Sequence, residues 1–301
     1  MNPLRRTLTL VLALALATTA CSGGSEAQVA AVGDTVITEG DLADLYETGV
    51  NALTIDPALR STIFGMVAKA ILIDAVRADF GVELEQEEVD GVEQAMLDQM
   101  NASSLTPADY LGIPNAGLAM IRHNAEIAVI REVAQRHLAS DPVIIAEILA
   151  DPTAVSTVCA RHILVNTEEA ATAALERVQG GEDFAAVADE VSIDSAPGGD
   201  LGCRLANAYV TEFAVASVEA PLNEPTGPVQ TQFGYHVILV TDITVAAEED
   251  VRANPQEFMS PSEIDDLWSA WLTERLQDAE VELDPKYGQW TAFGILPPSE
   301  G

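Results

Sequence analysis

The sequence contains few basic residues, few aromatic residues and few cysteines, and each shortage narrows what the chain can be. Its 14 lysine and arginine residues stand against 48 acidic ones, which gives a formal net charge of -34 at pH 7. So acidic a surface repels phosphate backbones, and nucleic acid is therefore excluded as a predicted partner. Aromatic residues make up only 5% of the chain, so a core must be built mainly from aliphatic side chains, and a hydrophobic content of 48% is sufficient for one.

Long apolar runs are also missing, apart from one at the N-terminus. Leu8 to Ala17 is apolar and follows the basic pair Arg5 and Arg6. A membrane-spanning helix needs roughly 20 apolar residues, so this run is too short to be one. The arrangement is typical of an export signal, and residues 1–20 are predicted to be a signal peptide.

Small residues lead from this run into Cys21, and a polar tether follows over residues 21–28. Small residues before a cysteine resemble a bacterial lipoprotein signal, in which Cys21 becomes the lipidated N-terminus. The alternative is ordinary cleavage after Ala20, which leaves a free thiol. The first interpretation predicts a lipid-anchored protein on the extracytoplasmic side of the cell membrane.

The pattern of the chain changes near residue 152. Over residues 29–152 it predicts a short strand or extended arm, Val29 to Ile37, and then helices that begin at capping signals such as Thr38 and Pro57. No catalytic or ligand-binding motif is visible in this half. Residues 157–243 read as strand, helix, helix, strand, helix, strand, which predicts a compact α+β unit.

Three local expectations accompany this division. Asn166, with Glu169 three residues later, is expected to cap the first helix of the α+β unit. The apolar stripe of a last helix, Pro261 to Gln277, must pack on another element, so residues 260–301 are assigned to the N-terminal domain. The stretch from Pro285 onward is expected to be irregular.

Five short motifs follow one another within the α+β unit. They are Arg161–Val165 (RHILV), Gly180–Phe184 (GGEDF), Gly198–Gly202 (GGDLG), Glu212-Phe213 and Gly227–Ile238 (GPVQTQFGYHVI). In this order and spacing they resemble parvulin-type (PpiC-like) peptidyl-prolyl isomerases, and the flanking regions resemble SurA- and PrsA-type export foldases. The resemblance implies an α+β fold: a parvulin domain with an antiparallel sheet and flanking helices, inserted in or appended to an all-helical SurA-like domain that a C-terminal helix completes.

The resemblance also implies a set of site residues. Two histidines face each other from adjacent central strands, an aspartate faces the substrate carbonyl, and a threonine bonds within the histidine network; these are His162, His236, Asp194 and Thr231. Aromatic side chains form the proline pocket and its rim, namely Tyr209, Phe213 and Phe233. Rotation about an X-Pro amide breaks no bond, so neither cofactor nor metal is implied.

Each assignment has a structural alternative. The histidines could be purely structural, Asp194 could cap a turn, and Phe213 could be an ordinary core residue. Tyr209 stands where the family usually has Met, and the loop after the first strand lacks the basic cluster of phosphate-reading parvulins. A catalytic thiol is conceivable, but Cys159 and Cys203 do not match the family's cysteine position, and a disulfide between them is the preferred interpretation.

The sequence therefore predicts an exported peptidyl-prolyl cis/trans isomerase that helps unfolded or partly folded chains with X-Pro bonds to fold. One alternative is a holdase chaperone whose parvulin unit is catalytically weak. A lipoprotein scaffold for a surface complex is a third hypothesis.

Overall fold

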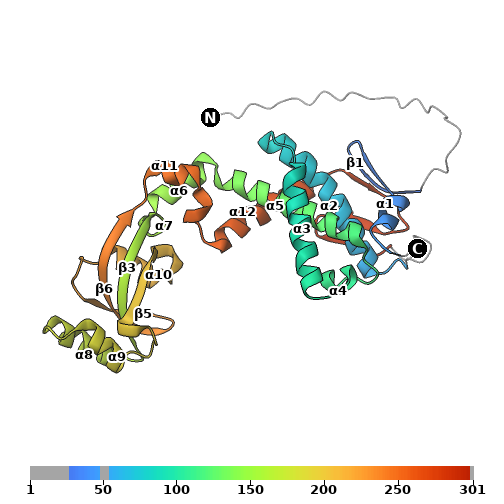
Figure 1. Cartoon of the computed structure of the whole chain (residues 1–301). Helices are drawn as coiled ribbons and strands as arrows, with labels where there is room; N and C mark the ends of the chain where they lie inside the picture. The colour runs from blue at the N-terminus through green and yellow to red at the C-terminus, as the bar shows by residue number, and fades with distance from the viewer. Residues whose placement is uncertain (1–26, 48–53, 299–301) are drawn as a thin grey trace, which may run out of the picture.

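The computed structural model describes residues 27–47 and 54–298 and shows two lobes (Figure 1). The predicted signal peptide and the lipidation residue Cys21 lie outside the described residues. One lobe is mainly helical, and the other contains a four-stranded sheet. The predicted α+β fold class, with an antiparallel parvulin-like sheet, is confirmed.

The helical lobe is built on two long helices that pack side by side and run in the same direction, α2 and α5, with α3 packed along α5. Its N-terminal helices are α1 (Glu39–Asp44), α2 (Pro57–Phe80), α3 (Gln86–Ala102), α4 (Pro107–Leu111) and α5 (Leu118–Ala139). Thr38 and Asp41 form the predicted capping box at the start of α1. Asp56 caps α2 ahead of Pro57, and Gly81 ends that helix with a positive φ of 71°, where glycine avoids a side-chain clash.

The end of the chain completes this lobe. Helix α12 (Pro261–Asp278) packs against α2 and α5, where Trp268 and Trp271 are buried among aliphatic side chains. The indole N–H of Trp271 donates a 2.8 Å hydrogen bond to the carboxylate of Asp79 on α2. The apolar stripe of α12 therefore packs against helices of the N-terminal half, as the sequence predicted.

A three-stranded sheet joins the first and last parts of the described chain, although the sequence predicted an all-helical domain preceded by a single short strand or extended arm. Its strands are β1 (Gln28–Val32), β2 (Thr35–Thr38) and β7 (Val281–Leu283), in the order β2-β1-β7. A second hairpin, β8 (Gln289–Thr291) with β9 (Gly294–Leu296), occupies the stretch that was expected to be irregular. Strands of three residues carry too little alternation for the sequence to reveal them.

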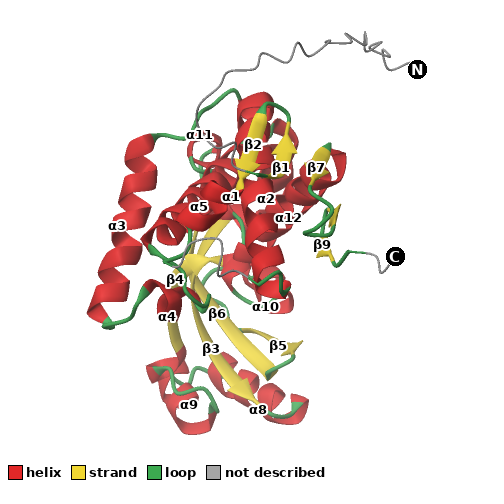
Figure 2. Ribbon diagram, turned by 90° about the vertical axis from the view of Figure 1, so that its right-hand side faces the viewer, coloured by secondary structure: helices red, strands yellow, loops and turns green. Residues whose placement is uncertain are grey.

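The second lobe has an antiparallel sheet of order β4-β3-β6-β5 with helices on both faces. Its elements are β3 (Ser156–Val165), α8 (Glu168–Gln179), α9 (Phe184–Val191), β4 (Asp200–Leu205), α10 (Thr211–Glu219), β5 (Thr226–Thr231) and β6 (Gly234–Val245). Helices α8 and α9 lie at the end of the sheet farthest from α1 and α2 (Figures 1 and 2). Helices α8 and α9 cover one face of this sheet and α10 covers the other.

Two expectations for this lobe are corrected. Thr167, not Asn166, caps α8, because its hydroxyl accepts from the backbone N–H of Ala170 and the helix begins one residue later. Strand β5 was not predicted, because Pro228 lacks a backbone N–H to donate and therefore indicates a break in a strand. The structure accommodates Pro228 because β5 is an edge strand.

Short helices connect the lobes. The chain enters the sheet lobe through α6 (Pro142–Ala150) and α7 (Pro152–Val155), and returns through α11 (Glu248–Ala253) and the 3-10 turn η4 (Pro255–Phe258). The predicted domain limits stay predictions, because the transition is spread over these helices. Within the described ranges, no helix is both long and apolar enough to cross a membrane.

Cys159 and Cys203 occupy facing positions on β3 and β4 and form a disulfide. Both residues lie inside their strands, because β3 begins at Ser156 and β4 at Asp200. The bond joins an edge strand to the central pair of the sheet.

Candidate active site

The two histidines reach the same face of the sheet because of strand periodicity. His162 on β3 and His236 on β6 lie on adjacent antiparallel strands, in a register that pairs Leu164 with His236. Alternate side chains of a strand point to opposite faces. Ile163 and Val237 accordingly pack under α8 and α9, while both histidines face the side covered by α10.

A continuous hydrogen-bonded chain runs through the four residues that the resemblance assigned to the polar floor of the site. His162 Nε2 lies 2.8 Å from Asp194 Oδ2, and its Nδ1 lies 3.1 Å from His236 Nδ1. His236 Nε2 lies 2.8 Å from Thr231 Oγ1. Both histidines are buried, with 5% and 4% of their surfaces exposed.

One arrangement of protons satisfies every link of this chain with neutral imidazoles. A carboxylate only accepts, so His162 donates from Nε2 to Asp194 and keeps an acceptor at Nδ1. His236 then donates from Nδ1 to His162, and Thr231 donates its hydroxyl proton to His236 Nε2. The backbone N–H of Phe233 donates to the Thr231 oxygen at 3.1 Å. The chain is therefore polar and directional without a buried positive charge.

The electrostatics favour a neutral His236 and an ionised Asp194. The pKa of His236 falls to about 4, and burial of the ring is the main cause. Burial by itself raises the pKa of Asp194, but hydrogen bonds from the Ala196 backbone and from His162 outweigh it, and the net pKa lies below its ordinary value. Near neutral pH the site therefore holds an anionic Asp194 and a neutral His236.

An apolar pocket of about 450 Å³ opens above the histidines. Phe213, on α10, is 2% exposed and meets the His236 ring edge-on, with centroids 5.3 Å apart. Tyr209 packs on Phe213 at 4.8 Å, and the guanidinium of Arg204 lies over the Tyr209 ring. Phe233 also lines the pocket and is 59% exposed, which places it at the rim.

The structure therefore brings together all seven residues that the sequence placed at the site. Six of them line the pocket, and Thr231 lies beneath His236. Their roles stay predictions.

The loop that carries Asp194 is held by residues that the sequence reasoning missed. The Ser192 hydroxyl accepts from the backbone N–H groups of Leu164 on β3 and of Asp194 itself. Gly199 has a φ of 69°, and a β-carbon on it would lie 2.1 Å from the carbonyl oxygen of His162. The loop can approach β3 this closely only with glycine at that position.

The pocket walls were also incompletely predicted. Leu164, Leu201, Ala208 and Val210 line it beside the aromatic residues. Leu201 stands inside the GGDLG motif, so the motif was the available signal for it. The other three show no feature that separates them from ordinary core residues.

Comparison with known proteins gives the class to which this site belongs. Residues 144–244 match the model of the PPIC-type PPIase domain. These residues therefore form a parvulin-type peptidyl-prolyl isomerase domain, as the motifs of the sequence predicted.

The similar proteins are foldases. The foldase protein PrsA of Caldanaerobacter subterraneus subsp. tengcongensis is 43% identical over 103 residues, which cover 33% of this chain and 34% of that protein. The foldase protein PrsA 3 of Bacillus anthracis is 25% identical over 286 residues, covering 92% of this chain and 93% of that protein. The predicted resemblance to PrsA-type foldases is confirmed by these relatives.

Solved structures are similar at a lower level. The crystal structure of a peptidylprolyl isomerase (PrsA) from Bacillus anthracis has a TM-score of 0.49 and 18% identity, and the match covers 71% of this chain and 96% of that one. Against the Caldanaerobacter protein, the aligned part spans about a third of the relative's length.

Proposed function

We propose that this protein is a peptidyl-prolyl cis/trans isomerase that catalyses the folding of exported polypeptides. The observation that carries the proposal is the unbroken chain from Asp194 through His162 and His236 to Thr231, directly beneath an apolar pocket containing Phe213. The completeness of this chain favours a working isomerase over a holdase with a weak parvulin unit.

The chemistry required is differential binding. The X-Pro amide resists rotation by roughly 18–20 kcal/mol because of its partial double-bond character. Each tenfold acceleration requires the twisted amide to be bound about 1.4 kcal/mol more tightly than the planar one. The pocket around Phe213 holds the proline ring, and the polar chain fixes the charge of Asp194 near the carbonyl. No proton transfer or covalent step is needed.

The test is isomerisation of a short X-Pro peptide by the purified protein and by the Phe213→Ala variant. Phe184→Ala is the matched control, because Phe184 is also a buried phenylalanine of this lobe but packs on the opposite face of the sheet. We expect Phe213→Ala to lose most of the catalysis and the control to keep it at a temperature where both are folded. Equal activity in the two variants contradicts the assignment of the pocket.

His236→Ala examines the polar floor separately. Its loss opens the chain between His162 and Thr231, so the rate should fall even though the apolar pocket remains. A wild-type protein that is folded but gives no rate above background removes the isomerase proposal altogether.

We also propose that the protein works outside the cytoplasmic membrane, anchored through a lipid on Cys21. The N-terminal apolar run and its small residues before Cys21 support this. The disulfide between Cys159 and Cys203 is consistent with an oxidising compartment. Metabolic labelling with a fatty-acid analogue should mark the protein and leave a Cys21→Ala variant unmarked. An equally labelled variant refutes the anchor.

A further inference from the structure

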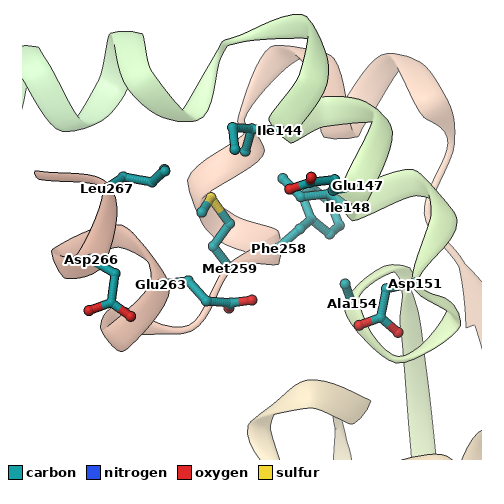
Figure 3. A pocket seen from close by; sticks show the side chains of 10 residues that line it. All are labelled: Ile144, Glu147, Ile148, Asp151, Ala154, Phe258, Met259, Glu263, Asp266 and Leu267. Carbon is teal, nitrogen blue, oxygen red and sulfur yellow. The ribbon is translucent and has the colours of Figure 1, made fainter. Parts of the chain in front are cut away.

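A second pocket, of about 330 Å³, lies where the two lobes meet (Figure 3). Side chains from α6 and α7 face side chains from η4 and the start of α12 across it. We call it the junction pocket and define it by its apolar residues Ile144, Phe258, Met259 and Leu267 together with the carboxylates described next. The four apolar side chains are only half-buried, so the pocket presents them to solvent.

Four carboxylates surround this apolar floor: Glu147 and Asp151 on one side, Glu263 and Asp266 on the other. All four are exposed, and within the described ranges none of them forms a salt bridge, although Asp151 and Glu263 accept backbone N–H hydrogen bonds at the starts of α7 and α12. The neighbouring Asp265, by contrast, is paired with Arg131 at 2.6 Å. The pocket therefore combines uncovered apolar surface with negative charge that this chain does not neutralise.

The four carboxylates are too far apart to bind a metal ion together. In the part of the chain that the structure describes, no three His, Cys, Asp or Glu side chains converge closely enough to hold a metal ion. Charges spread around an apolar floor match a ligand whose cationic groups are also spread around an apolar centre. A peptide segment with an apolar side chain flanked by lysine or arginine has this form.

We propose that the junction pocket docks such a cationic and apolar segment of a client polypeptide. The inference rests on the proposed function, because it takes the occupant to be part of a chain that is being folded. Its geometry relative to the isomerase site supports this. Helix α7, which lines the pocket through Ala154, continues directly into β3, and His162 is reached at most about 28 Å further along the chain. A client of roughly eight extended residues spans that distance.

The test measures binding of a short, fluorescently labelled, proline-free peptide of alternating lysine and leucine residues. The double variant Glu147→Gln/Asp266→Asn keeps shape and removes two charges from opposite sides of the junction pocket. We expect it to weaken binding about three- to tenfold at low ionic strength. The difference should shrink as salt is added, because exposed charges are screened.

The matched control is Glu169→Gln/Glu176→Gln, which makes the same change of net charge on the exposed surface of α8. It should bind the peptide as the wild type does. If the two double variants weaken binding equally, only the net charge of the protein matters and the proposal fails. If neither variant weakens binding, the carboxylates of the junction pocket do not bind the peptide and the proposal also fails.

Changes to the peptide test the same idea without changing the protein. Acetylating the lysines, or replacing the leucines with serine, must each weaken binding to the wild type. Binding that survives either change overturns the proposal. Isomerisation of a short X-Pro peptide, measured in parallel on the wild type, reports on the proposed function alone. Selective peptide binding without isomerisation would retain the docking site and reject the isomerase, and isomerisation without selective binding would do the reverse.

Discussion

His123 is predicted to make the helical lobe sensitive to acid. It lies on α5, is 6% exposed, and its pKa falls from 6.5 to about 4. Burial is the main cause, and the positive charge of Lys69 lowers the pKa further against the opposing charge of Glu126. The folded protein therefore keeps this imidazole neutral at a pH where the unfolded chain protonates it.

The sign and the size of the effect follow from linkage. Between its two pKa values the unfolded chain binds one more proton than the folded chain, so stability falls as the pH is lowered. Above the unfolded pKa the imidazole is neutral in both states and costs no stability. As the pH falls from the unfolded pKa toward the folded pKa, the unfolding free energy decreases steadily. For one histidine with these values, lowering the pH from about 7 to about 5 costs roughly 2 kcal/mol of unfolding free energy.

The assay is urea denaturation at the two pH values for the wild type and for His123→Gln. The variant cannot titrate, so its stability should fall by roughly 2 kcal/mol less over the same pH interval, whatever its absolute stability. His137→Gln, a more exposed histidine of the same helix, provides the comparison for loss of an imidazole. An identical pH dependence in the wild type and His123→Gln refutes a neutral buried His123.

Three further perturbations follow from the structure. The double variant Cys159→Ser/Cys203→Ser opens a loop with a sequence separation of 44 and should lose up to about 4 kcal/mol in denaturant titrations; a stability equal to that of the oxidised wild type would contradict this. Trp271→Phe keeps the ring packed and removes the indole donor of Asp79, which stays paired with Arg275, so a loss of about 1 kcal/mol is expected in the same assay, and no loss would show that the bond is not needed. Gly199→Ala places a β-carbon against the backbone of β3, so isomerase activity should fall more than in the control Gly202→Ala, where a positive φ is shared but no atom is near; equal losses would mean that strain rather than crowding decides.

The isomerase domain could be predicted from the sequence in unusual detail, because its motifs are local and carry their own spacing. The histidine pair, Asp194 and Phe213 all stand inside or beside such motifs, and the structure brings them together. What could not be predicted depends on contacts between distant segments. The Trp271 bond to Asp79 and the β1–β7 pairing have sequence separations that no local pattern reports.

Errors at element ends have a different origin. Asn166 and Thr167 both carry side-chain oxygens suited to capping, and the choice between neighbours depends on where the helix axis leaves the sheet. The junction pocket was invisible for a similar reason. Its carboxylates come from helices more than a hundred residues apart in sequence, and each of them taken alone is an ordinary exposed acid.

The pairing of β1 with β7 has a consequence for the order in which the chain can fold. The sheet lobe is one continuous segment, so all of its strands and helices are present once residue 245 has emerged. The helical lobe must wait, because its three-stranded sheet requires β7 and the cluster around Trp268 and Trp271 requires α12, and both elements lie near the end of the sequence. During vectorial synthesis this protein therefore completes its sheet lobe first, while its helical lobe exposes the apolar surfaces that its own C-terminal segment later covers.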